Sequence, residues 1–295
     1  MGSNSMFEDQ PSLIQVFDPE DATTTTTGSS SPWNQEHPNP TRTPKAPTPL
    51  ILMHDGGGTI FSYYCLGDLR RTVHGIANPH YETGRAWAGG IPEMARDYLG
   101  FVASVVPTGG DVILGGWSLG GLLALEMARQ AAADGSVRVV GLVMVDSVCP
   151  LAPVGGGRNP PLVVPHAMQW HEHTRPETRE KVMRCFAEAV RMVGEWTLPV
   201  WEGKAGDGPK PPPVVMLRAR ESVPVAEGVS RVDLHRSDRL LGWGGYRKDL
   251  IKEIIDIPGH HYNVFDTEDN VDAATEAIAK ACLLVEKLDA GRAFS

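Results

Sequence analysis

Residues 111–127 read Asp-Val-Ile-Leu-Gly-Gly-Trp-Ser-Leu-Gly-Gly-Leu-Leu-Ala-Leu-Glu-Met, and this stretch decides the fold. The apolar run Asp111–Gly115 leads into Gly116-Trp-Ser-Leu-Gly120, and a helix-forming run follows directly. A Gly-x-Ser-x-Gly motif between a strand and a helix is typical of the tight turn that carries a nucleophilic serine above a parallel sheet. Side chains at positions 116 and 120 would collide with neighbouring backbone in such a turn. The motif therefore predicts Ser118 as a nucleophile.

Comparable apolar runs recur on both sides of this stretch and predict a parallel sheet. Segments with helical spacing of apolar residues separate most of them, which favours an α/β fold of the α/β-hydrolase type, with helices on both faces of a mostly parallel sheet. The expected strands are 49–53, 74–77, 111–115, 139–145, 214–217 and 254–257, and the expected helices are 61–71, 91–106, 119–133 and 270–288.

Two segments fall outside this rhythm. Residues 1–47 contain TTTTTGSSS and a Pro-rich stretch with few core-forming residues, so we expect them to be flexible or loosely draped. The catalytic domain is expected over 48–295. Within it, residues 147–213 are too long for a plain connection and predict a helical lid.

The lid helix has its own start signal. Thr174 and Glu177 form a potential capping box, with Pro176 in the first turn. The apolar face expected for this helix consists of Val182, Met183, Phe186, Val190 and Val193.

Charge and composition exclude several classes of partner. A formal net charge of -9 would repel nucleic acid or an anionic membrane surface. No apolar run approaches the roughly 20 residues that span a bilayer, and MGSNSMFEDQ has no signal-peptide pattern. The four cysteines lack a CxxC pair, so neither a disulfide framework nor a metal site is expected. We expect a cytoplasmic protein without a membrane anchor.

A serine hydroxyl needs a base, which in this fold follows the last strand. Gly259-His260-His261-Tyr262 occupies that position. Either histidine could instead be an ordinary loop residue, but the position favours one of them as the base, and we assign His261.

The acid that orients the histidine has four candidates. Asp146 directly follows the expected strand 139–145, at the sheet edge where Ser118 lies, although aspartate there could simply cap a turn. Glu221, Asp233 and Asp238 follow the strand after the lid, where many hydrolases carry this acid. We favour Asp146.

The negative oxygen of a tetrahedral intermediate requires two hydrogen-bond donors. One is expected from the backbone N–H of Leu119, the residue after the nucleophile. The other is expected from the glycine-rich loop His54-Asp-Gly-Gly-Gly58, at the N–H of Asp55 or Gly56. A phosphate-binding loop is excluded because no Gly-Lys-Ser/Thr follows.

With these residues in place, the chain resembles the thioesterase domains of polyketide and nonribosomal peptide synthases, especially fungal ones. The resemblance covers about 48–288 and rests on HDGGG, GWSLGG, VDS with Asp146, and GHHYNVF. It implies an acid after the strand that follows the nucleophile turn, which supports Asp146, and a Gly-x-His-aromatic pattern, which matches His261. No carrier-protein sequence precedes the domain, so a free-standing enzyme or an excised domain is implied.

The leading functional hypothesis is hydrolysis or transfer of a polyketide-like acyl chain through an acyl-Ser118 intermediate. The chain would arrive as a thioester on the phosphopantetheine arm of an acyl carrier protein or on coenzyme A, and the enzyme itself would need no cofactor. Lid side chains would either contact this acyl chain or only pack the lid. They are Met168, Trp170, Phe186, Met192 and Trp196.

Two other readings remain open. A carboxylesterase, lipase or peptidase of the same fold would use the same three residues. A non-catalytic module that docks carrier proteins would be expected to have lost one of them, and none is missing.

Overall fold

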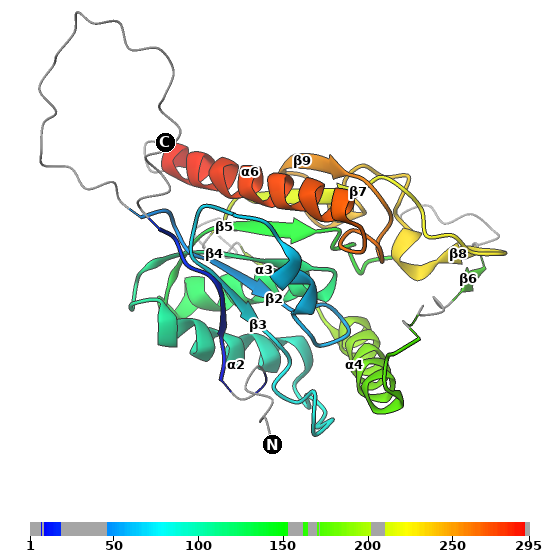
Figure 1. The fold of residues 1–295 in the computed structure, drawn as a ribbon. Coiled ribbons are helices and arrows are strands. Elements are labelled where there is room, and N and C mark those ends of the chain that lie inside the picture. The colour runs from blue at the N-terminus through cyan, green and yellow to red at the C-terminus, as the bar shows by residue number, and fades with distance from the viewer. Residues whose placement is uncertain are drawn as a thin grey trace, which may run out of the picture.

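The computed structural model describes residues 7, 9–18, 46–152, 162–164, 170, 172–201 and 210–292. Its main sheet has seven strands in the order β1-β3-β2-β4-β5-β7-β9 (Figure 1). All neighbouring strands are parallel except β1, which runs antiparallel to β3. The strands are β1 (Ser12–Gln15), β2 (Leu50–Met53), β3 (Val73–Ile76), β4 (Asp111–Trp117), β5 (Arg138–Val145), β7 (Val214–Ala219) and β9 (Ile251–Ile257). Each of the six expected strands is present.

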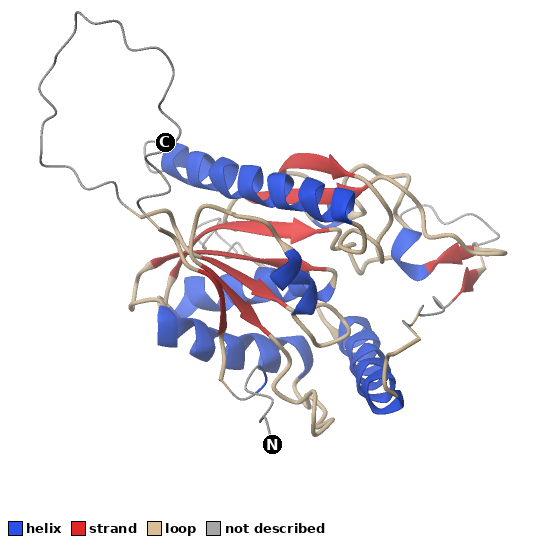
Figure 2. Cartoon of the chain, in the orientation of Figure 1, coloured by secondary structure: helices blue, strands red, loops and turns tan. Residues whose placement is uncertain are grey.

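Helices cover both faces of the sheet (Figure 2). Alternate residues of a strand point to opposite faces, so each central strand contributes to two cores. Ile51 and Met53 of β2 pack in one core with α2 (Gly90–Val105) and α3 (Leu119–Asp134). Leu50 and Leu52 pack in the other core with α6 (Glu268–Arg292). The α/β class predicted from the sequence is confirmed.

The helix expected over 61–71 is wrong beyond its first turn. Only Phe61–Cys65 are helical, as the 3-10 helix η2. After it, the backbone finds partners outside a helix: the Gly67 N–H donates to Thr275 Oγ1 (3.1 Å) and the Leu69 N–H donates to Gln15 Oε1 (3.0 Å). Hydrogen bonds from α6 and from the N-terminal segment therefore replace helical ones here.

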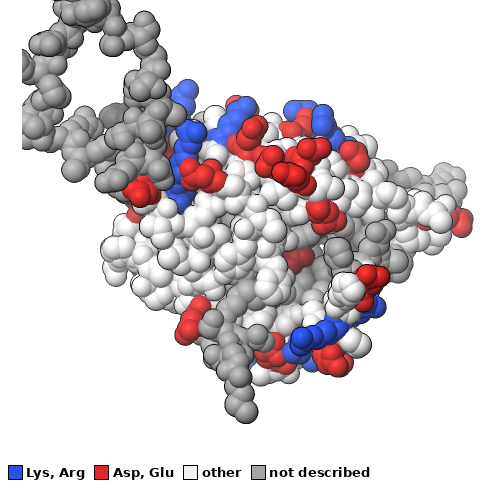
Figure 3. Space-filling model, viewed as in Figure 1, with Lys and Arg blue, Asp and Glu red and all other residues white. Residues whose placement is uncertain are grey.

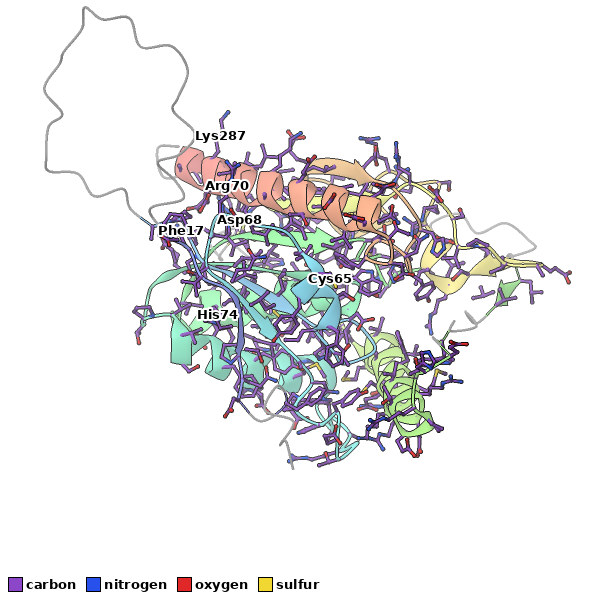
Figure 4. The ribbon with its side chains drawn as sticks, viewed as in Figure 1. Phe17, Cys65, Asp68, Arg70, His74 and Lys287 are labelled. Atoms are coloured by element: carbon purple, nitrogen blue, oxygen red, sulfur yellow. The ribbon has the colours of Figure 1, made fainter. Side chains whose placement is uncertain are left out.

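Part of the N-terminal segment belongs to the sheet, which corrects the expectation of a loose segment for those residues. β1 adds to the edge of β3, with Leu13 opposite His74, and Phe7 stacks on Tyr81 with ring centroids 4.5 Å apart. Figure 4 shows Phe17, after β1, on the same side of the molecule as Asp68 and Arg70. β1 was not predicted, because this partly exposed edge strand is placed by the strand it pairs with rather than by a buried apolar run of its own.

The segment expected to form the lid contains α4 (Pro176–Glu195), which lies near the carboxyl ends of the central strands (Figure 1). The expected capping box is wrong: Arg175 is the N-cap and no side chain caps the helix. Pro176, whose fixed φ suits a first turn, starts the helix instead.

The apolar face expected for α4 is shifted. Met183 and Val190 are exposed, whereas the buried residues are Cys185, Ala189 and Met192. Small and sulfur-containing side chains face the body of the protein here, which hydrophobic spacing alone did not indicate.

The remaining elements are short. β6 (Val163–Val164) pairs with β8 (Val229–Ser230) in a small separate sheet, and η3 (Arg231–Asp233) and α5 (Trp243–Tyr246) precede β9. Figure 3 shows Lys and Arg interspersed with Asp and Glu over α6, beside a broad area without charged side chains. Among the described residues, no helix has the length and apolar character needed to cross a membrane.

Candidate active site

Ser118 sits on the tight turn between β4 and α3. Its φ of 56° and ψ of -114° are unusual for a residue with a side chain, and strain of this kind is typical of functional turns. A Cβ on Gly116 would lie 2.5 Å from the Met53 carbonyl oxygen, and a Cβ on Gly120 would lie 2.4 Å from the same oxygen. Glycine at both positions therefore lets the turn pack against the end of β2, as the motif predicts.

His261 lies on the loop after β9 and faces Ser118. Its Nε2 is 3.0 Å from Ser118 Oγ. The Trp117 indole N–H donates to the His261 carbonyl (3.0 Å), which ties this loop to the strand that carries the serine. His260 points elsewhere, since its Nδ1 accepts a hydrogen bond from the Tyr262 N–H (3.3 Å). Of the two neighbouring histidines, the structure brings His261 to the serine.

Asp146 follows β5 and is fully buried. Its Oδ2 lies 2.8 Å from His261 Nδ1, so a continuous hydrogen-bonded chain links Asp146, His261 and Ser118. Burial alone would raise the pKa of the Asp146 carboxyl, but hydrogen bonds from Arg236 and His261 hold that pKa well below its usual range. Asp146 is therefore ionised at neutral pH.

The three other candidate acids are engaged elsewhere. Glu221 accepts the Gly259 N–H (3.3 Å), and Asp238 accepts the N–H groups of Leu240 (3.0 Å) and Gly242 (2.9 Å). Asp233 binds the Arg236 side chain, with its Oδ1 2.9 Å from Arg236 Nε. The carboxylate that contacts His261 is that of Asp146.

The His54 side chain forms a hydrogen bond with the backbone of the glycine-rich loop after β2. His54 Nδ1 lies 2.5 Å from the Asp55 carbonyl oxygen, which can only accept, so Nδ1 carries the proton and Nε2 accepts the hydrogen bond from the Tyr98 hydroxyl (2.6 Å). Burial lowers the pKa of His54 to about 4, so this tautomer is neutral.

That hydrogen bond also orients the next peptide group. The Asp55 carbonyl and the Gly56 N–H belong to one planar peptide unit and point in opposite directions when it is trans. Within the described part of the chain, the Gly56 N–H has no acceptor, and the Leu119 N–H opens α3 without an intrahelical acceptor. The Asp55 N–H likewise has no backbone acceptor in the described part of the chain, so both loop donors stay predictions.

Asp55 places a carboxyl group in the same loop. Its Oδ1 accepts the Gly57 N–H (3.0 Å), and burial raises the pKa of this carboxyl to about 6 despite that bond and the charge of His261, both of which lower it. The pKa of this carboxyl is thus raised toward neutral pH at a position whose charge interacts with that of His261.

The side chains expected to line the lid divide into two groups. Phe186 of α4 covers the glycine loop, because a Cβ on Gly56 would lie 2.8 Å from its ring. Trp170 lies 5.9 Å from the Arg179 guanidinium, and Met168 is outside the described residues. Met192 and Trp196 are buried in the core, and the Trp196 indole N–H donates to Glu126 (3.4 Å). For these two, the structure shows packing, which is one of the two uses expected from the sequence.

One residue of the site was missed in the sequence. Arg236 makes a two-pronged contact with Asp146, with Nη1 2.7 Å from Oδ1 and Nη2 2.8 Å from Oδ2. The only signal was its place three residues after Asp233, in a segment rich in both charges, and such spacing is common on protein surfaces.

The arrangement brings a hydroxyl, an imidazole and a carboxylate together at one sheet edge, near backbone N–H groups of the glycine-rich loop and of Leu119 that have no backbone acceptor among the described residues. These are the groups needed for acyl transfer by way of an ester on a serine. In the described ranges, no three His, Cys, Asp or Glu side chains are grouped so that they could hold a metal ion.

Comparison with known proteins places this site in context. Residues 48–195 match the model of the thioesterase domain family. The thioesterases frbD and frbE of Dothideomycetidae sp. (strain 11243) are 37% and 34% identical, over 84% and 82% of this chain and 93% and 92% of their own lengths.

The structural comparison agrees with the sequence comparison. The crystal structure of the NocB thioesterase domain from the nocardicin cluster is 25% identical, with a TM-score of 0.56, over 79% of this chain and 93% of that domain. The same domain is also known in covalent complex with a fluorophosphonate nocardicin G analog. The α/β-hydrolase fold expected from the resemblance is confirmed.

Proposed function

Because the chain belongs to the thioesterase domain family, we propose that it cleaves acyl thioesters through an acyl-Ser118 intermediate. The single observation that best supports this is the hydrogen-bonded chain from Asp146 through His261 to Ser118. A hydroxyl beside an imidazole whose far nitrogen faces an ionised carboxylate is activated as a nucleophile.

In the proposed reaction, Ser118 Oγ attacks the thioester carbonyl carbon while His261 Nε2 accepts the hydroxyl proton. The N–H groups of Leu119 and Gly56 stabilise the negative carbonyl oxygen. The C–S bond then breaks, and the leaving sulfur takes the proton from His261. In the second half, water or another hydroxyl or amine attacks the acyl-serine ester and gives its proton to His261. The bond between the acyl group and Ser118 Oγ then breaks, the product is released, and His261 returns the proton to Ser118.

We further propose that the acyl chain is polyketide-like and arrives on the phosphopantetheine arm of an acyl carrier protein or on coenzyme A, in the cytoplasm. Phe186 over the glycine loop supports an apolar acyl contact at this position. The arm would enter as part of the substrate, so the protein itself would supply only side chains and backbone.

The direct test is intact-mass analysis after incubation with acyl-coenzyme A thioesters and with acylated carrier protein. We expect an added mass equal to the acyl group in the wild type, and none in Ser118→Ala. Ser147→Ala is the matched control, because Ser147 is a fully buried serine near the same turn whose hydroxyl donates to the Val145 carbonyl (3.4 Å).

Several outcomes would contradict the proposal. If a fluorophosphonate probe fails to label Ser118 in the folded wild type, a non-catalytic docking module gains support. If p-nitrophenyl esters are turned over much faster than matched thioesters, the enzyme is a carboxylesterase. Acyl mass on Ser118→Ala equal to that on the wild type would place the nucleophile elsewhere.

A further inference from the structure

The Asp146 carboxylate has more partners than a histidine alone requires. Each of its oxygens accepts two hydrogen bonds: Oδ1 from the Ala219 N–H (2.9 Å) and Arg236 Nη1, and Oδ2 from His261 Nδ1 and Arg236 Nη2. Two carboxylate oxygens offer about four acceptor sites, so the group is saturated. Half of its bonds come from Arg236.

Arg236 is itself held firmly in place. It is buried, its Nη1 also donates to the Ala219 carbonyl (2.8 Å), and its Nε donates to Asp233 Oδ1. Asp233 Oδ2 in turn accepts the Val223 N–H (2.6 Å). Asp233, Arg236, Asp146 and His261 thus form a continuous row of hydrogen-bonded side chains in which the first three alternate in charge.

The two-pronged contact fixes the plane of the carboxylate. A guanidinium fork and a carboxylate are both planar, and paired hydrogen bonds hold them close to one plane. With Arg236 in place, the Oδ2 lone pair that remains is directed at His261. A lysine could keep the charge but would hold the plane through one point only.

The same contact has an electrostatic consequence. A carboxylate beside an imidazole favours the protonated imidazolium, and a guanidinium on that carboxylate offsets part of its charge. Asp233 in turn offsets part of the charge of Arg236. Arg236 therefore reduces the degree to which Asp146 favours a proton on His261, and Asp233 partly restores it.

We propose that Arg236 is a positioning residue that orients the Asp146 carboxylate toward His261. Its charge also reduces the degree to which Asp146 favours a proton on His261, and Asp233 opposes this second effect. This inference rests on the proposed function for its kinetic consequences alone. A merely structural arginine would affect stability without moving the titration of His261.

Other charged groups near His261 must be held constant in a test. Asp55 lies close enough for its charge and that of His261 to interact, and the Tyr262 ring lies 4.9 Å from the His261 ring. Among the described residues, the charged or titratable groups that interact with His261 include Asp146, Asp55, His260 and Tyr262, and Arg236 and Asp233 act through Asp146.

The experiment is a pH titration of His261 followed by NMR of the labelled imidazole in the full chain, combined with kcat/KM against pH for an acyl-coenzyme A substrate. Arg236→Gln removes the charge, so the His261 midpoint and the acidic limb of kcat/KM should both move to higher pH. Asp233→Asn strengthens the effect of Arg236, so both should move down. Arg236→Lys should leave the midpoint near that of the wild type and lower kcat by roughly 10- to 100-fold.

Arg239→Gln is the matched control, since Arg239 is exposed and pairs with Asp256 (3.1 Å) instead. Folded Arg236→Gln with an unchanged midpoint overturns the proposal, as do shifts of Arg236→Gln and Asp233→Asn in the same direction. If Arg236→Gln does not fold, the downward shift in Asp233→Asn still decides. The NMR titration needs no turnover, so an inactive wild type would refute the proposed function without removing this test.

Discussion

At the scale of single residues, Asp55 is a site group whose carboxyl pKa is raised toward neutral pH. Its carboxyl pKa is raised to about 6 by burial, and the charge of His261 lowers it. Such an interaction is mutual: a cation that favours the Asp55 anion is equally favoured by it. Ionised Asp55 therefore favours a proton on His261.

Replacing Asp55 by asparagine should shift the acidic limb of kcat/KM to lower pH, because His261 loses a neighbouring negative charge. Asparagine keeps an oxygen that can accept the Gly57 N–H, so the loop should stay in place. The measurement is kcat/KM across pH. Asp68→Asn is the control, since Asp68 forms the same kind of local bond to the Arg70 N–H (2.7 Å) on the exposed surface. A limb that stays in place in Asp55→Asn would contradict the expected coupling.

The same substitution bears on stability. A carboxyl whose folded pKa exceeds its unfolded value loses stability as pH rises through the interval between them. For Asp55, this interval runs from the ordinary aspartate pKa of 3.8 to about 6. Asp55→Asn should therefore gain stability relative to the wild type at about pH 7, and lose this advantage near pH 4, in thermal unfolding.

At the scale of elements, hydrophobic runs and one motif were sufficient to predict six strands and the α2, α3 and α6 helices. Their stability depends on burial along the whole element, which leaves a periodic pattern. β1 and the residues after η2 could not be predicted, since their hydrogen bonds come from distant segments. The exposed Met183 and Val190 show the same limit for α4, whose buried face depends on what it packs against.

The site residues also divide into those that the sequence predicts and one that it does not. Ser118, His261 and Asp146 each follow a strand whose register fixes their meeting point, so the sequence located them. Arg236 follows the 3-10 helix η3 rather than a strand of the main sheet, and its role depends on a contact with a residue 90 positions away in the chain. Nothing in its neighbourhood in the sequence marks that contact.

The contact between β5 and α6 gives an element-scale prediction. A Cβ on Gly141 would lie 2.2 Å from Val285 Cβ, so Gly141→Ala must push α6 away from the sheet. We expect a loss of about 1–3 kcal/mol in the free energy of unfolding, measured in urea. Gly100→Ala in α2 meets nothing within 4 Å and should instead gain about 0.5–1 kcal/mol. Equal stabilities of the two variants would show that α6 is not seated as described.

At the scale of the whole molecule, strand order explains where the site lies. From β2 the chain moves outward to β3, then returns to place β4 on the other side of β2. In open α/β sheets, ligands bind at the carboxyl ends of strands where the order reverses in this way. The glycine loop follows β2 and Ser118 follows β4, so both belong to this point, while β1 closes the sheet edge on the far side of β3.

This separation predicts that the β1 edge supports stability without supporting catalysis. The Gln15 side chain makes three hydrogen bonds, donating to the carbonyls of Leu66 (3.2 Å) and Gly67 (2.8 Å) and accepting the Leu69 N–H (3.0 Å). Gln15→Ala leaves these groups unpaired and should cost about 1–3 kcal/mol. We expect a lower Tm with an unchanged kcat/KM at temperatures where the variant is folded.

Leu13→Ala is the control from the same strand, because Leu13 is 52% exposed and its loss should change stability by no more than about 0.5 kcal/mol. The two variants separate the anchoring of β1 by side-chain hydrogen bonds from its apolar contacts. If Gln15→Ala lowers kcat/KM at a temperature where it is fully folded, the edge strand is coupled to the site. The route for such coupling would run through η2, where the Tyr63 hydroxyl accepts the Trp117 N–H (2.9 Å) next to Ser118.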